Sequence, residues 1–82
     1  MHFVYILRSQ KYKRTYIGSS KNIEERLSEH NSGMVRSTKF YKPYNLIHKE
    51  VFATKSEARK RETELKNNSY KKEVLFKSLG LL

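Results

Sequence analysis

The chain has 82 residues, which is enough for one small domain with a modest core. Lysine and arginine number 18 against eight glutamates, and the net charge is +10. The absence of cysteine excludes disulfides and cysteine-ligated zinc sites, and no apolar run reaches the length of a membrane span. We therefore expect a cytoplasmic domain that binds a polyanion, most simply a nucleic acid, and not a membrane.

Two strands joined by a hairpin are predicted at the start of the chain. Residues 3–7 are apolar on both alternating faces, a pattern typical of a strand that is covered on both sides. After a short basic connection, residues 15–18 resume a strand, which predicts antiparallel pairing. Tyr16 and Gly18 share one face of this second strand. Whether Tyr5 of the first strand lies on the same side depends on the register, which the sequence leaves open.

A helix is predicted to begin after Asn22, an N-cap residue with Glu25 as its capping-box partner three positions later. At about 100° per residue, four side chains fall on one stripe of this helix: Ile23, Arg26, Leu27 and His30. Arg26 and His30 thus lie at the flank of the buried face, where charged groups usually have a specific role. Gly33 is a typical helix end.

Residues 34–44 are predicted to form a loop in which basic and aromatic residues alternate. The members of this loop are Arg36, Lys39, Phe40, Tyr41, Lys42 and Tyr44. Two interpretations stay open. The basic groups hold phosphates while the rings stack on bases, or the rings seal the edge of the core while the cations face solvent.

A third strand and a longer helix are predicted next. Residues 45–52 have strand composition, and a capping box that begins at Thr54 predicts a helix over residues 55–67. The inward stripe of this helix contains Ala58, Arg61, Glu62 and Leu65. The other glutamates of the helix point away, so Glu62 is the acid that we expect to face inward.

A last helix is predicted over residues 70–79, with Ser69 as its cap and Gly80 as its stop. Its expected apolar contacts are Val74, Leu75 and Leu79. No internal repeat, linker or low-complexity segment interrupts the sequence, which favours a single domain over residues 1–82.

Five elements of the sequence, taken in order, resemble the GIY-YIG nuclease family, in particular its small stand-alone members. They are Val4-Tyr5-Ile6 at the place of the first motif, Tyr16-Ile17-Gly18 as the complete second motif, the spacing between the two, the run from Arg26 to Gly33, and the run from Arg61 to Lys66. The likeness covers nearly the whole chain. Two departures are visible: Val4 stands where a glycine would precede Tyr5, and the basic residue that some repair-nuclease relatives carry behind Gly18 is missing or displaced to Lys21.

The resemblance implies an α+β fold, a three-stranded antiparallel sheet flanked by helices, with a metal-dependent phosphodiesterase site formed by Tyr5, Tyr16, Arg26, His30 and Glu62. Glu62 would hold one divalent cation, Mg²⁺ or Mn²⁺, and Arg26 would grip the scissile phosphate. Tyr5 or Tyr16 would orient or deprotonate the attacking water. A phenol has a pKa of about 10, so a base role requires nearby cations that lower it. Arg26 and His30 could supply that field, or His30 could relay the proton.

The expected partner is DNA, and the sequence does not separate DNA from RNA. The residues expected to contact it outside the catalytic set are Lys21, Arg36, Lys39, Lys42 and Lys66. Without an additional DNA-binding module, we expect low intrinsic selectivity or recruitment by a protein partner. Three functions stay open: an endonuclease that cleaves DNA, including branched or damaged DNA; a basic nucleic-acid-binding module of the same fold with little catalysis; and a protein-interaction domain whose charge is incidental.

Overall fold

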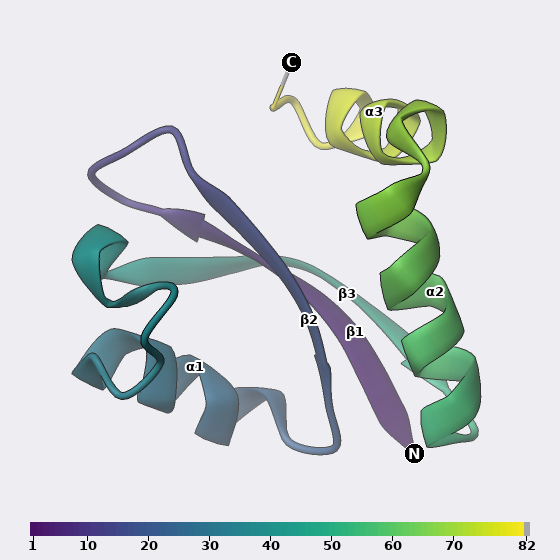
Figure 1. Ribbon diagram of the computed structural model, residues 1–82, viewed down its shortest axis with the longest axis horizontal. Coiled ribbons are helices and arrows are strands. Elements are labelled where there is room, and N and C mark those ends of the chain that lie inside the picture. The colour runs from purple at the N-terminus through teal and green to yellow at the C-terminus, as the bar shows by residue number, and fades with distance from the viewer. Residues whose placement is uncertain (82) are drawn as a thin grey trace.

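A computed structural model describes residues 1–81, which form an α+β fold of a three-stranded antiparallel sheet with three helices (Figure 1). The strands are β1 (His2–Ser9), β2 (Thr15–Ser20) and β3 (Tyr44–Phe52), in the order β2-β1-β3. The helices are α1 (Ile23–Ser32), α2 (Lys55–Asn67) and α3 (Ser69–Ser78), and a 3₁₀ turn, η1, covers Lys39–Tyr41. Within residues 1–81, no helix is long and apolar enough to cross a bilayer. The predicted fold class is confirmed.

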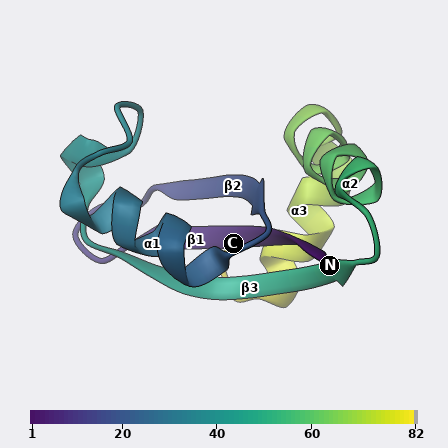
Figure 2. The same cartoon turned by 90° about the horizontal axis from the view of Figure 1, so that it is seen from below.

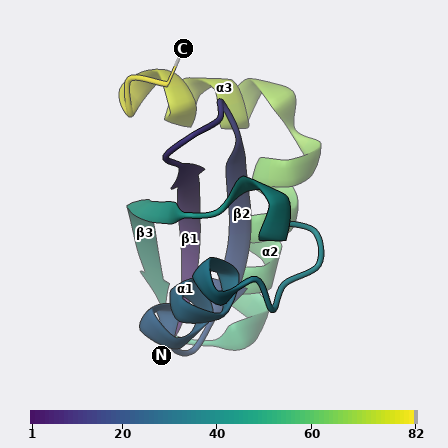
Figure 3. The same ribbon diagram turned by 90° about the vertical axis from the view of Figure 1, so that its left-hand side faces the viewer.

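β1 is the central strand, and each of its two faces supports a core, as its doubly apolar pattern predicted. Val4 and Ile6 face a core that contains residues of β2, α2 and α3. Tyr5 and Leu7 face a second core, which α1 and the segment before β3 cover. Figure 3 shows α1 in front of the strands and α2 behind them, and Figure 2 shows α2 and α3 together on the right, with α1 to the left.

The register of the hairpin places both motif tyrosines on the same side of the sheet. Tyr5 lies opposite Gly18, and Leu7 lies opposite Tyr16. Directly opposed residues of antiparallel strands project from the same face. Tyr5, Tyr16 and Gly18 therefore all face the α1 layer, which answers the question of register that the sequence left open.

α1 begins after Asn22, its predicted N-cap, two residues beyond the end of β2. The Asn22 side chain accepts a hydrogen bond from the backbone N–H of Glu25 at 3.1 Å. In a complete capping box the Glu25 side chain would accept a hydrogen bond from the backbone N–H of Asn22. Here that N–H donates to the Ser20 hydroxyl instead, at 3.0 Å. Gly33 ends the helix with a φ of 83°. These caps hold α1 beside the tyrosine face of the sheet.

α3 differs from its prediction in its cap and in its buried side chains. Asn68, not Ser69, is the N-cap, and its side chain accepts a hydrogen bond from the Lys71 backbone N–H at 3.1 Å. Asn68 is also the C-cap of α2, so one residue caps both helices. The prediction assigned Asn68 to the end of α2 alone and therefore placed the next cap one residue too late. Val74 is 54% exposed, whereas Phe76 is buried in the core beside α2.

An ion network joins β3 to α2 and α3. Arg61 donates to both carboxylate oxygens of Glu50, at 2.8 and 3.1 Å, and to Glu64 at 2.7 Å. Lys71 of α3 donates to the other oxygen of Glu64 at 3.0 Å. Arg61, predicted on the inward stripe, therefore ties the helix to the edge strand, and Glu64 points away from Glu62 as expected but is only partly exposed.

We expect this network to make the fold sensitive to acid. Arg61 lowers the pKa of the Glu50 carboxyl below its ordinary value of 4.5, so the native carboxylate binds a proton less readily than the unfolded one. This stabilisation is complete above about pH 5 and is lost as the pH falls through the lowered native pKa. Arg61→Met should lower the free energy of unfolding by about 1 kcal/mol at neutral pH, or Tm by roughly 4–8 °C, and should lose less stability than the wild type as the pH falls. Circular dichroism melts at several pH values measure Tm for both proteins. Parallel plots of Tm against pH would contradict the prediction.

Candidate active site

A hollow of about 400 Å³ lies at the β2 edge of the sheet, where side chains from both layers meet. The residues predicted from the sequence that line it are Tyr5, Tyr16, Arg26, Glu62 and Lys66. The residues that were not predicted are Ser19, Arg59 and Thr63. β1, β2, α1 and α2 all contribute, so the structure brings together segments that are far apart in the sequence. His30, the remaining member of the predicted catalytic set, lies behind the hollow and does not line it.

Glu62 reaches the hollow from α2, and both of its carboxylate oxygens accept hydrogen bonds. The Ser19 hydroxyl donates to Oε1 at 2.6 Å, and the Lys66 ammonium donates to Oε2 at 2.7 Å. Burial alone would raise the pKa of the Glu62 carboxyl, but the bonds from Lys66 and Ser19 outweigh it and lower the pKa below 4.5. The carboxylate is therefore ionised at neutral pH.

Glu62 suits a hard divalent cation as its single protein ligand. Within residues 1–81, no group of three or more histidine or acidic side chains is placed to hold a metal ion. An ionised carboxylate that faces an open hollow fits the way Mg²⁺ binds in many sites, where water and substrate phosphate complete the coordination. Lys66 would have to move, because its ammonium forms an ion pair with Oε2 of Glu62.

Tyr5 and His30 form a buried pair that connects the hollow to the loop after α1. The Tyr5 hydroxyl lies 3.4 Å from Nε2 of His30, and Nδ1 of His30 lies 2.8 Å from Oγ1 of Thr38. The single hydroxyl hydrogen of Thr38 goes to the Val35 carbonyl at 3.3 Å. His30 therefore donates from Nδ1 and offers Nε2 to Tyr5 as an acceptor. Burial, helped by Arg26, lowers the pKa of His30, which keeps the imidazole neutral at pH 7.

The electrostatics of Tyr5 correct one expectation. A role as a base required nearby cations to lower the pKa of a tyrosine. For Tyr5, which is 1% exposed, burial raises the pKa above 10.0, and the neighbouring Arg26 guanidinium offsets only part of this effect. In the free protein Tyr5 is thus a phenol that donates a hydrogen bond, and not a phenolate.

Arg26 lies on α1 and lines the hollow together with Tyr5. It forms an ion pair with Glu29 one helical turn later, and its side chain stays 36% exposed. Contact with the Tyr5 hydroxyl and with Glu29 raises the pKa of Arg26, so the guanidinium is charged throughout the accessible pH range. The ion pair with Glu29 uses Nη1 and the contact with Tyr5 takes a second part of the guanidinium, so the donors that remain can bind an anion.

Of the predicted nucleic-acid contacts, Lys66 lines the hollow and the others do not. Lys21 lines a neighbouring hollow of about 540 Å³, which Arg26 also lines. Three further cations are exposed on the segment between α1 and β3: Arg36, Lys39 and Lys42. Tyr44, the first residue of β3, is buried, while Phe40 of η1 is 74% exposed, so sealing the core explains one ring but not the other.

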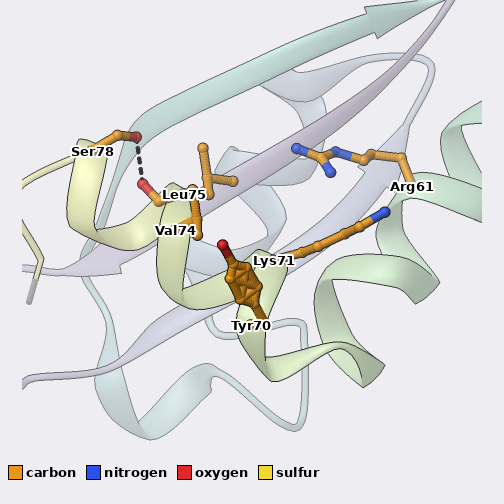
Figure 4. A pocket seen from close by; sticks show the side chains of 6 residues that line it. All are labelled: Arg61, Tyr70, Lys71, Val74, Leu75 and Ser78. Carbon is orange, nitrogen blue, oxygen red and sulfur yellow. Dashed lines mark hydrogen bonds between the residues drawn. The ribbon is translucent and has the colours of Figure 1, made fainter.

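Another hollow, of about 350 Å³, lies between α2 and α3 and contains none of the predicted catalytic residues (Figure 4). Its lining includes Arg61 and Lys71, with the exposed ring of Tyr70 at its mouth. Both cations are held by the ion network described above. No carboxylate of the described part of the chain lines this hollow, whereas Glu62 lines the one at β2.

Helical and strand spacing could have identified some of the residues that sequence reasoning missed. Arg59 precedes Glu62 by three positions, and residues at that spacing share a helix face. Ser19 alternates with Gly18 on β2 and so faces the α2 layer, where Glu62 lies. Thr38, which holds His30, lies in a loop and carries no comparable signal.

Gly18 is needed because two tyrosine rings pass over it. A Cβ atom at this position would lie 2.6 Å from the Tyr5 hydroxyl oxygen and 2.8 Å from Cε2 of Tyr16. Gly18 lies within β2 and not at a positive φ, so close packing, and not turn geometry, accounts for the glycine.

Gly18→Ala should therefore displace both tyrosines. We expect a loss of about 1–3 kcal/mol of stability, measured by urea unfolding, together with shifted ring signals of Tyr5 and Tyr16 in the NMR spectrum. Gly80→Ala is the matched control, because no atom lies within 4 Å of the added Cβ there, although φ is 76°. That variant should lose stability through backbone strain alone and leave both ring signals in place. Unshifted ring signals in Gly18→Ala would contradict the packing argument.

Comparisons with known proteins agree with this architecture. The family model described as the GIY-YIG catalytic domain matches residues 1–74. A UPF0213 protein of Staphylococcus saprophyticus is 41% identical over 80 residues, which cover 96% of each chain, and one of Staphylococcus aureus is 38% identical over 89% of each chain. The NMR structure of a UPF0213 protein from Bacillus halodurans matches with a TM-score of 0.56 and 32% identity, over 95% of this chain and 83% of that one. The chain therefore belongs to the GIY-YIG family.

Proposed function

We propose that residues 1–82 form a single endonuclease domain that hydrolyses DNA phosphodiester bonds with the help of one divalent metal ion. The observation that carries the proposal is the hollow at β2, where an ionised carboxylate, a guanidinium and two tyrosines meet. Membership of a nuclease family supports the same chemistry. We further propose that the protein works in the cytoplasm, and that a protein partner supplies the selectivity that so small a domain lacks.

Arg26 and Glu62 would bind the two charged components of the reaction. The Arg26 guanidinium would hold an oxygen of the scissile phosphate and stabilise the negative charge that grows there. Glu62 would hold Mg²⁺ or Mn²⁺, which when bound polarises a phosphate oxygen and favours departure of the leaving oxygen. Lys21 and the exposed cations of the loop after α1 would contact the DNA backbone outside the hollow.

Tyr5 and His30 would handle the proton of the attacking water. Tyr5 would accept this proton while its own hydroxyl hydrogen passes to Nε2 of His30, which the bond to Thr38 orients as an acceptor. Tyr5 is neutral before and after such a transfer, so its raised pKa does not oppose the step. Tyr16, whose ring centroid lies 4.6 Å from that of His30, would position the imidazole and the water.

Lys66 should compete with the metal ion for Glu62. We expect Lys66→Met to strengthen Mn²⁺ binding about two- to fivefold, because the ion pair that must break is partly exposed and weak. Titration followed by electron paramagnetic resonance of free Mn²⁺ measures the affinity. Lys71→Met is the matched control, since it removes one positive charge and one ion pair outside the hollow. Equal affinity in all three proteins would argue against the competition.

The proposed activity can be tested with supercoiled plasmid and branched DNA. The purified protein should nick these substrates with Mn²⁺ or Mg²⁺ and should leave them intact in EDTA. Equal cleavage in EDTA would contradict the metal-dependent mechanism. Steeply salt-dependent binding without cleavage would instead support a non-catalytic nucleic-acid-binding module of the same fold.

A further inference from the structure

A smaller hollow of about 210 Å³ adjoins the candidate active site, and the proposed chemistry does not use it. We call it the tyrosine hollow. Its aromatic and basic lining consists of Arg14, Tyr16, Tyr41 and Tyr44. Tyr16 lines both hollows, so the two meet at this ring. A polymer whose backbone lies across the catalytic residues can therefore place the group next to the reacting bond in the tyrosine hollow.

Contacts between the hairpin and η1 hold the tyrosine hollow open. The Arg14 guanidinium lies 4.4 Å from the centroid of the Tyr41 ring and donates to its hydroxyl at 2.7 Å. The Ser9 hydroxyl donates to the Tyr41 carbonyl at 2.6 Å, and the Tyr12 ring packs edge-on against Tyr41 at 5.4 Å. The hairpin and η1 lie at the same end of the sheet (Figure 1). The ring and the guanidinium are thus held in place before any ligand binds.

This lining suits a flat aromatic ligand that carries hydrogen-bond acceptors. Tyrosine rings stack on nucleobases, and a guanidinium both stacks and donates to base acceptors. Three exposed lysines lie on the same two segments as Arg14 and Tyr41 and would hold the adjoining phosphates: Lys11 and Lys13 on the hairpin and Lys39 on η1. A base inside a duplex has both faces covered by its neighbours, so only an unpaired base can enter.

We propose that the tyrosine hollow is a subsite for an unpaired nucleobase next to the scissile phosphate. The inference rests on the proposed function, and it specifies the substrate as a DNA strand with an unpaired nucleotide beside the bond that is cut. Thr38 forms one wall of the hollow and also holds His30, so a seated base lies next to the proton relay.

The test measures binding by the wild-type chain in EDTA, where no metal-dependent cleavage occurs. The probes are a single-stranded oligonucleotide of about 12 nucleotides that contains 2-aminopurine, and a blunt duplex of the same sequence. The single strand should bind with quenching of the 2-aminopurine fluorescence. Tyr41→Ala should weaken this binding about fivefold or more and abolish the quenching, while duplex binding stays unchanged. Tyr41→Phe keeps the ring and should retain both signals.

Tyr70→Ala is the matched control, because it removes an exposed tyrosine beside a lysine on α3. Three results would overturn the subsite. Tyr41→Ala could weaken binding of the single strand and of the duplex equally, or could weaken neither. Tyr70→Ala could weaken single-strand binding as much as Tyr41→Ala does. Nicking by the wild-type protein with Mn²⁺ alongside such a result would leave the proposed function intact. Selective binding through Tyr41 in a protein that never cleaves would support the subsite and refute the nuclease.

Discussion

Glu62→Gln should lower metal-dependent DNA cleavage by about 100-fold or more, with DNA binding retained. The amide keeps the size of the carboxylate and can still accept the bond from Ser19. It loses the negative charge, and among the described residues that line the hollow Glu62 is the one acid that could bind a divalent cation. Cleavage rates at saturating Mn²⁺ and fluorescence anisotropy with labelled DNA measure the two properties separately.

Glu64→Gln is the matched control for this variant. Glu64 lies on the same helix, but its carboxylate pairs with Arg61 and Lys71 outside the hollow. We expect a lower melting temperature and unchanged cleavage. If Glu62→Gln cleaved DNA at the wild-type rate, the carboxylate could not be the metal ligand, and the chemistry would have to take place elsewhere on the surface.

Tyr5→Phe should slow cleavage by about 10²- to 10⁴-fold, the range expected when a positioned proton-transfer group is removed. The ring stays in the core, so the fold should be preserved. Activity of the wild-type protein should fall at acid pH, as His30 takes up a proton and can no longer accept one from Tyr5. Because the pKa of His30 is lowered from 6.5, this loss should begin below that pH.

The pH profile distinguishes a relay from a merely structural tyrosine. In Tyr5→Phe the path to His30 is broken, so the residual activity should lose this acid dependence. Tyr16→Phe should slow the reaction less and keep the acid dependence, because the Tyr5–His30 contact survives. A larger effect of Tyr16→Phe than of Tyr5→Phe would reverse the two roles.

The sequence predicts the secondary structure well because the signals are local. The doubly apolar run at residues 3–7 predicted a strand covered on both faces, and the caps at Asn22 and Thr54 predicted where α1 and α2 begin. Helical spacing also placed Glu62 on the partly buried side of α2. The cap of α3 was missed because Asn68 serves two helices at once.

The electrostatics of the candidate site depend on tertiary contacts that a sequence does not contain. The register that brings Tyr5 over Gly18 arises from pairing across the whole hairpin. The depth of burial raises the pKa of Tyr5 in spite of the neighbouring Arg26, which helical spacing alone did not indicate. The hydrogen bond from Ser19 to Glu62 joins residues 43 positions apart, and no local sequence pattern indicates that the two side chains meet.

The central claim is that a divalent metal ion and DNA meet in the hollow at β2, and NMR tests it most directly. Mn²⁺ added to the ¹⁵N-labelled protein with a short DNA oligonucleotide broadens the amide signals nearest to the bound ion. The account predicts broadening centred on Ser19, Arg26 and Glu62. Broadening centred instead on Glu50 and Glu64, with the signals of the hollow unchanged, would contradict it.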